Sequence, residues 1–342
     1  MSLSQQFEVS AVDEAPRLAL APCAARVEAV DQGLRDRLAA SLSYLAEFAP
    51  QDDRRQASFA KLKTTLKSGP VSPWVFGLYS KLVAALSADP RGNVGGDFDA
   101  VLEAARLPAD LGVVACRDPG VPVLWWDHFR LLFDTDRKRP FHPQAPAPES
   151  FACCRQDIER GLALMQRADP IWHEEVSHLL RLIVLGAPAS AEVTDLFNGA
   201  STFFLWGATL INAGVRRTAV STADLLVHES SHGMLFGFSA EGALTHNGGD
   251  ERYTSPLRAD ARPIDGIFHA CFVATRVHLA MCRLLDSGGL TAVEEQQAAA
   301  RRVFNGNAAR TALGVLAQHA KPTKLGDEIL GTIRAYWAKT PD

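Results

Sequence analysis

Hydrophobic positions at helical spacing predict helices over the first third of the chain. In residues 27–48 apolar side chains recur every three or four positions, and a proline follows at position 50. Residues 51–66 predict a second, more charged helix, and residues 73–87 a strongly apolar third one. A proline- and glycine-containing break at positions 89–92 ends this helical part.

The middle of the chain contains a candidate boundary. Residues 121–133 are rich in tryptophan and phenylalanine, and the Pro-rich stretch 138–148 that follows is typical of a connector. We therefore expect a helical N-terminal part, residues 1–149, and a metal-binding catalytic domain, residues 150–342. The two parts are also compatible with one compact unit.

After the connector the hydrophobic period changes. Residues 150–167 predict a helix, whereas residues 179–185 and 202–213 are short apolar segments bounded by glycines, which is typical of strands. Residues 218–236 return to a helical pattern. The polar, glycine-rich stretch 240–261 predicts a long loop, and loops of that length are usually functional.

The C-terminal region reads as helical again. Residues 264–285 predict a strongly apolar helix, and residues 291–320 a further helix with a break near Gly306. Another break at Pro322 precedes a helix over residues 327–338. The predicted fold class is α+β: mostly helical, with a zincin-like metal helix beside a small β-sheet and a helical N-terminal part.

Composition and charge narrow the classes of partner. The 342 residues carry a formal net charge of -4, so no strong field attracts nucleic acid or an anionic membrane. We expect no membrane helix and no signal peptide, since no apolar run reaches the required length and the first residues lack a basic-then-apolar pattern. Six scattered cysteines without a CxxC spacing indicate reduced thiols. A cytoplasmic protein is expected.

One short segment carries metal chemistry: His228-Glu229-Ser230-Ser231-His232. Two histidines four residues apart on a helix lie on one face, about 6 Å apart, and can chelate one ion. Glu229 would project beside that ion, where a zinc hydrolase uses it as the base that deprotonates water. The surrounding positions are apolar, and polar side chains there need a partner such as a metal.

A third ligand would decide the chemistry. A short peptidase spacing requires glycine at position 235 and histidine at 238, but Leu235 and Phe238 stand there, which excludes that variant. The apolar segment 264–285 contains no glutamate, so a peptidase with a downstream helical glutamate is disfavoured. Glu241 and Glu251, in the polar loop, stay possible.

Histidines offer the other candidates for the third ligand. His269 is a single polar residue early in an apolar helix, the position expected if that helix packs on the first and supplies a ligand. His246, in the loop, is its rival. His173 and His178 are five residues apart and diverge around a helix, so we interpret them as ordinary, partly exposed histidines.

The two halves of this region together resemble a known family. The HExxH segment is followed by residues 255–269, which fill every fixed position of the pattern SPxRxDxRPxxGxxH. This resembles the HEXXH-motif peptide-modification proteins of ribosomal peptide natural products, which include iron(II)/2-oxoglutarate-dependent β-hydroxylases. The resemblance covers residues 175–285. The HExxH half is shared with many metallopeptidases, whereas the second half is specific.

The resemblance implies a ligand set and cofactors. His228, His232 and His269 would bind Fe(II), with zinc as the alternative metal. This set differs from the two-histidine, one-carboxylate arrangement usual in non-haem iron oxygenases. Three neutral ligands leave the ion more positive, which favours dianionic 2-oxoglutarate, and three positions would stay open for this co-substrate and dioxygen.

The far carboxylate of 2-oxoglutarate needs a cation, ideally a bidentate guanidinium. Arg262 and Arg276 are the favoured candidates, with Arg258 behind them. Each has a simpler explanation: Arg258 as a solvated loop residue, Arg262 as the partner of Asp260 or Asp265, and Arg276 in an internal salt bridge.

Three functions follow as hypotheses. The first is a 2-oxoglutarate-dependent dioxygenase that hydroxylates a carbon, the β-carbon by resemblance, of a peptide residue or an amino acid in natural-product biosynthesis. There Glu229 would orient a histidine or bind a polar substrate group. The second is a zinc metallopeptidase or amide hydrolase with Glu229 as general base. The third is a non-catalytic, metal-stabilised peptide-binding module.

Overall fold

The computed structural model describes residues 18–48, 52–89, 92–134, 140, 142–189, 197–255 and 260–340. The chain forms two compact units, each assembled from separate stretches. The motif unit comprises Met1–Val27, Asp157–Ser177 and Arg217–Asp342, and the sheet unit comprises Glu28–Gln156 and His178–Arg216. The predicted boundary between residues 149 and 150 falls in the first turn of a helix, Pro148–Ala168.

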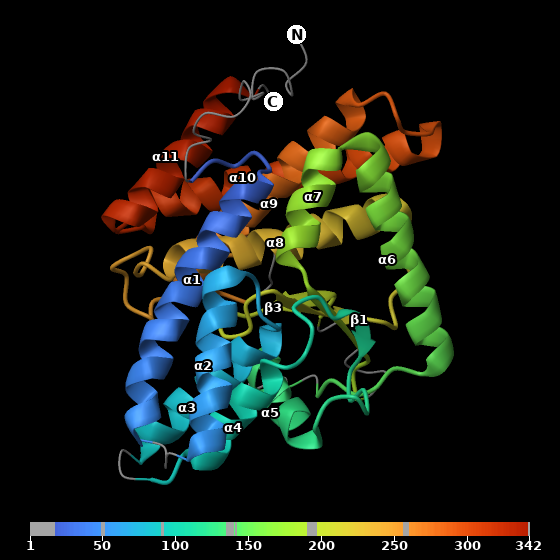
Figure 1. Cartoon of the computed structure of the whole chain (residues 1–342). Helices are drawn as coiled ribbons and strands as arrows, with labels where there is room; N and C mark the ends of the chain where they lie inside the picture. The colour runs from blue at the N-terminus through green and yellow to red at the C-terminus, as the bar shows by residue number, and fades with distance from the viewer. Residues whose placement is uncertain are drawn as a thin grey trace. The chain divides into compact units, whose positions relative to one another are not determined.

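Helices dominate the described residues, and a small mixed sheet completes an α+β fold (Figure 1). The helices are α1 (Ala24–Leu45), α2 (Asp53–Ser68), α3 (Pro73–Ala88), α4 (Gly95–Ala104), α5 (Val123–Phe133), α6 (Pro148–Ala168), α7 (Pro170–Leu179), α8 (Ala219–Ser239), α9 (Ile264–Asp286), α10 (Ala292–His319) and α11 (Lys324–Lys339), with a 3-10 turn, η2, at Ala46–Phe48. The strands are β1 (Gly112–Ala115), β2 (Leu182–Gly186), β3 (Gly199–Ser201) and β4 (Ala208–Asn212).

The sheet has the order β1-β2-β4-β3 and lies entirely in the sheet unit. β1 and β4 both run parallel to β2, and β3 pairs antiparallel with β4. Every residue of β2 and β4 is buried, which explains why neither strand alternates between apolar and exposed polar residues; Thr209 and Asn212 of β4 are themselves buried.

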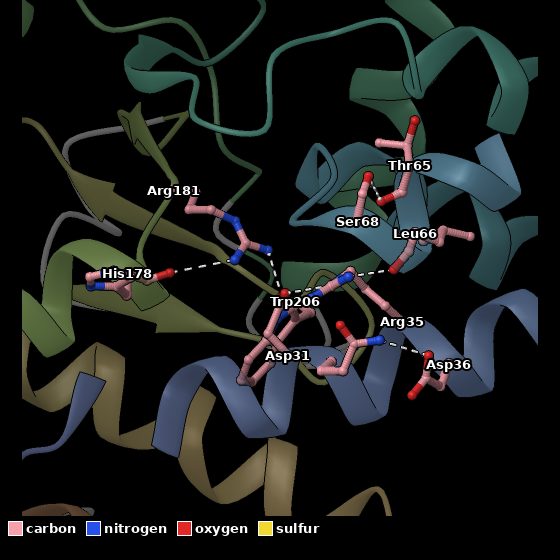
Figure 2. Close-up of polar contacts among 10 residues, drawn as sticks. Asp31, Arg35, Asp36, Thr65, Leu66, Ser68, His178, Arg181 and Trp206 are labelled. Carbon is pink, nitrogen blue, oxygen red and sulfur yellow. Dashed lines mark hydrogen bonds and ion pairs between the residues drawn. The ribbon is translucent and has the colours of Figure 1, made fainter. Parts of the chain in front are cut away.

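A buried ion cluster joins distant segments of the sheet unit (Figure 2). The Asp31 carboxylate accepts hydrogen bonds from Arg35 Nε (2.7 Å), Arg181 Nη2 (3.1 Å) and Trp206 Nε1 (2.7 Å). Arg35 also donates to the carbonyl of Leu66. All four polar side chains are at most 6% exposed, so one carboxylate on α1 holds the chain before β2 and the turn before β4.

Long apolar helices form the motif unit. α8 and α10 both pack on α9, which is the most buried helix of this unit (Figure 1). α11 contacts α9 through Trp337 Nε1, which donates to Thr275 Oγ1 at 3.0 Å. Among the described residues α9 alone is long and apolar enough to cross a membrane, but 83% of its apolar 18-residue stretch is buried inside the protein, as in a core helix.

Most predicted elements are confirmed within a few residues, and two predictions are wrong. A strand was predicted over residues 202–213, but only Ala208–Asn212 pairs in the sheet. Residues 203–207 form a turn instead. Gly306 does not break its helix, since α10 is continuous across it. There the glycine lets α10 approach α9: a Cβ would lie 3.0 Å from His278 Cδ2.

Candidate functional site

Helix α8 carries the HExxH segment in its middle turns. Its N-terminus is fixed by a capping box, in which the Thr218 side chain accepts from the Ser221 amide (3.2 Å) and the Ser221 hydroxyl accepts from the Thr218 amide (2.8 Å). His228 and His232 are half-buried, whereas Glu229 is only 2% exposed. The two histidines therefore lie on the less buried face of the helix.

The structure brings the three predicted ligands together within the motif unit. His228 Nε2 lies 3.2 Å from His232 Nε2, as their spacing on one helix predicts. His232 Nδ1 lies 3.1 Å from Nδ1 of His269, which belongs to α9. The rings of His232 and His269 are stacked, with centroids 5.3 Å apart. The packing of α9 on α8 thus adds His269 to the pair.

The donor chemistry of this cluster fits a transition metal, but the ring orientations do not yet form a complete site. Two imidazole nitrogens on one ion lie about 3.0–3.4 Å apart for bonds of about 2.1 Å. The His228–His232 separation of 3.2 Å meets this. His232, however, directs different nitrogens at its two neighbours. Correspondingly, no group of three or more metal-binding side chains among the described residues is arranged around one point. Binding by all three needs a ring rotation.

His269 is kept in the protonation state that binds metals. Burial lowers the pKa of His269 to about 4, and the nearby Asp265 carboxylate opposes this only weakly. Asp265 itself accepts a hydrogen bond from Thr245 Oγ1 at 2.9 Å. His269 is therefore neutral at physiological pH, with a nitrogen lone pair available.

Phe236 lies against the histidine cluster, one turn after His232 on α8. Its ring centroid is 4.8 Å from that of His269 and 6.3 Å from that of His232. Phe236 was not among the predicted site residues, although its four-residue spacing from His232 continues the spacing of the two histidines. This aromatic ring forms an apolar border of the cluster.

Arg276 is engaged inside the motif unit. Its side chain has no exposed surface, and Nη2 forms an ion pair with the equally buried Glu175 of α7. The guanidinium stacks on Trp172, 4.6 Å from the ring centroid. Nε and Nη1 have no hydrogen-bond partner in the described part of the chain. The internal salt bridge considered from the sequence is therefore present, and it uses only one of the three guanidinium nitrogens.

The structure gives less support to the other two predicted co-substrate arginines, Arg262 and Arg258. Arg262 Nη2 pairs with Asp260 Oδ2 at 2.9 Å, which is the simpler role that the sequence suggested. Its backbone also pairs with that of Tyr253, with both hydrogen bonds at 2.8 Å. Arg258 lies outside the described residues.

The loop between α8 and α9 is fastened to the C-terminal helices. Asn247 donates to the His319 carbonyl (2.9 Å) and accepts from the Lys321 amide (2.7 Å). Glu251 accepts hydrogen bonds from Tyr253, Gly248 and Asn247, which lower its pKa to about 2. His246 is exposed in this loop, and its amide donates to the Lys321 carbonyl. The alternative ligands Glu251 and His246 thus belong to an anchored loop.

A separate groove of about 290 Å³ lies in the sheet unit, between α2 and α4. None of the predicted site residues lines it. Arg55 at its wall is neutralised by Asp99, with two hydrogen bonds of 2.8 and 2.6 Å. Because its three arginines face three carboxylates, this groove has no net preference for an anion or a cation.

The comparisons with protein-family models and with curated proteins gave the same result. No protein-family model matches the chain, and no curated protein matches it significantly. The resemblance carried by the HExxH segment and residues 255–269 therefore stays a prediction.

Proposed function

We propose that this protein is an iron(II)/2-oxoglutarate-dependent dioxygenase that hydroxylates a carbon of a peptide residue or an amino acid. His228, His232 and His269 would hold the metal, in a zincin-like arrangement around α8. The observation that carries the proposal is the convergence of these three imidazoles from two helices, with nitrogen–nitrogen separations of 3.1 and 3.2 Å. When bound, iron(II) and 2-oxoglutarate would activate dioxygen, the oxidant: one oxygen atom would enter the substrate C–H bond, and the other the succinate that forms as 2-oxoglutarate loses CO2.

The three-histidine set favours an oxygenase that uses an anionic co-substrate. Neutral imidazoles leave the full charge of the ion uncompensated, so a dianion binds well beside it. The low pKa of His269, about 4, keeps this ligand neutral.

Arg276 fits the far carboxylate of such a co-substrate better than Arg262 does. It follows His269 by two turns of α9, about 10 Å along the helix axis. Glu175 holds one edge of its guanidinium, whereas Nε and Nη1 have no described partner and could donate to a carboxylate. Arg262 is already paired with Asp260.

Anaerobic titration tests the proposal directly. The protein is loaded with iron(II) without oxygen, and 2-oxoglutarate is then added. We expect a weak visible charge-transfer band that is lost in His269→Ala and shifts to higher 2-oxoglutarate concentration in Arg276→Lys. A loaded protein without any band would contradict an oxygenase.

The second candidate is a zinc hydrolase with Glu229 as base. The observation in its favour is the position of Glu229. It directly follows His228 and is only 2% exposed, which is where a zinc hydrolase places its general base. In this alternative, zinc-dependent cleavage of a peptide library would be lost in Glu229→Gln while zinc binding is kept. If the protein binds metal but shows neither activity, the non-catalytic binding module gains support.

A further inference from the structure

Phe236 lies on the less buried face of α8, although its immediate neighbours are buried. The positions around it, Met234, Leu235, Gly237 and Phe238, are all buried, whereas Phe236 is half-buried. It shares this partial exposure with His228 and His232, four and eight residues earlier. Two candidate metal ligands and an aromatic ring therefore follow one another at four-residue spacing along the less buried face of the helix.

The contacts of this ring place it at the candidate metal centre. Its centroid lies 4.8 Å from the ring of His269 and 6.3 Å from the ring of His232, so it contacts ligands from both helices. A phenylalanine that only filled the core would lie on the buried face of α8, as Phe238 does at 2% exposure. Phe236 instead is only partly buried, and its ring lies beside two of the side chains that would bind the metal.

We infer that Phe236 is a specificity-determining residue that contacts the substrate group held at the metal and selects for an apolar side chain. This inference rests on the proposed metal centre. An aromatic face beside the reacting carbon gains contact area with an aliphatic or aromatic group. A charged group in the same place would lose water without gaining a partner. The substrate class is then a peptide residue or amino acid with an apolar side chain.

Hydroxamates test this inference without knowledge of the natural substrate. A hydroxamate binds the metal through its two oxygens and extends its remaining group into the space beside the ligands. The probes are acetohydroxamate, with a methyl group, and benzohydroxamate, with a phenyl group. Their dissociation constants are measured by calorimetry on the full chain loaded with cobalt(II).

We expect benzohydroxamate to bind the native protein more tightly than acetohydroxamate does. In Phe236→Ala the ratio of the two affinities should fall by about five-fold, because an aromatic contact changes binding by roughly two- to ten-fold. Acetohydroxamate and cobalt(II) themselves should bind the variant within about two-fold of native. Phe236→Leu, which keeps an apolar side chain, should recover part of the preference.

The matched control is Phe304→Ala, the same change at an exposed phenylalanine of α10 in the same unit, with 62% exposure. It should leave the affinity ratio unchanged. An unchanged ratio in Phe236→Ala, or an equal loss for both hydroxamates, would overturn the inference while leaving the metal centre intact. Failure of cobalt(II) to bind the native protein would overturn the metal centre and the inference together.

Discussion

Arg276 of α9 and Glu175 of α7 form an ion pair in which neither side chain has any exposed surface. The second carboxylate oxygen of Glu175 accepts the backbone amide of Cys23 at 2.7 Å and lies 3.5 Å from Arg26 Nη2. One buried carboxylate thus connects the start of α1, α7 and α9 within the motif unit. A buried charge that loses its partner is costly, so we expect the Arg276–Glu175 ion pair to matter for the stability of the motif unit.

Removal of the carboxylate charge should destabilise the motif unit. Glu175→Gln leaves the Arg276 guanidinium buried without a counter-ion, and we expect a loss of about 3–5 kcal/mol in the free energy of unfolding. Urea unfolding followed by circular dichroism measures this loss. Adding Arg276→Met to the variant should recover part of the stability, because one of the two buried guanidinium groups beside position 175 is then removed.

The control for this prediction is Glu174→Gln, the same change at the exposed neighbouring residue. It should alter the free energy of unfolding by no more than about 0.5 kcal/mol. Equal effects of the two substitutions would show that the buried pair has no special role.

Only one half of this ion pair could be predicted from the sequence. An arginine inside an apolar helix indicated a buried partner or a ligand, because an isolated charge there is too costly. Its partner, Glu175, lies 101 residues earlier in the chain, in α7. No periodicity relates the two positions, since only the packing of α7 within the motif unit brings them together.

The histidine cluster should behave as one site. His228→Ala, His232→Ala and His269→Ala should each weaken binding of cobalt(II) by more than the 10- to 100-fold typical for loss of a residue that merely orients a ligand. The loss follows because each variant removes one metal–nitrogen bond. Titration of the visible cobalt(II) absorption measures the affinity, and the change in its intensity reports the coordination number.

His173→Ala, in α7 of the same unit, is the control and should leave cobalt(II) affinity unchanged. If His269→Ala also binds cobalt(II) like the native protein, the third ligand is a different residue. His246→Ala then tests the alternative that the sequence left open.

Two glycines of α10 should respond in opposite directions to the same substitution. A Cβ at Gly306 would lie 3.0 Å from His278 Cδ2, whereas at Gly314 there is nothing within 4 Å. Gly314→Ala should stabilise the protein by up to about 1 kcal/mol through helix propensity. Gly306→Ala should destabilise it by roughly 1–3 kcal/mol, because α10 and α9 must move apart. Thermal unfolding of the two variants measures both effects, and stabilisation by both would contradict a close approach at Gly306.

The same glycine explains why sequence patterns misplaced a helix break. Local propensity treats a glycine inside a helix as a weak point. At Gly306 the benefit is tertiary, because the missing side chain makes room for His278 of α9. The prediction of a strand over residues 202–213 was wrong in its first half. The aromatic residues that suggested it include Phe203 and Phe204, and both are exposed in a turn. In contrast, α8, α9 and the pairing of His228 with His232 followed from periodicity alone.

His278 should make the stability of the native protein depend on pH. This residue of α9 is 7% exposed, and burial lowers its pKa to about 4, with a smaller effect from the nearby Arg302 and Arg310. Its Nδ1 shares a hydrogen bond of 2.6 Å with the Tyr336 hydroxyl and lies 3.7 Å from Cys282 Sγ. In the unfolded chain the pKa is near the ordinary 6.5. Below that pH the unfolded state binds a proton that the folded state excludes, so stability falls as the pH decreases from 6.5 towards 4.

The variant His278→Gln isolates this effect, because its amide oxygen can still accept the Tyr336 hydroxyl but does not titrate. At pH 8 the variant should be the less stable protein, because its packing is altered. At pH 5 the difference in the free energy of unfolding should shift by about 2 kcal/mol in favour of the variant. Urea unfolding of both proteins across this range measures the difference. A constant difference for His278→Gln across this pH range would contradict the prediction, because it would mean that the folded protein accommodates the protonated ring.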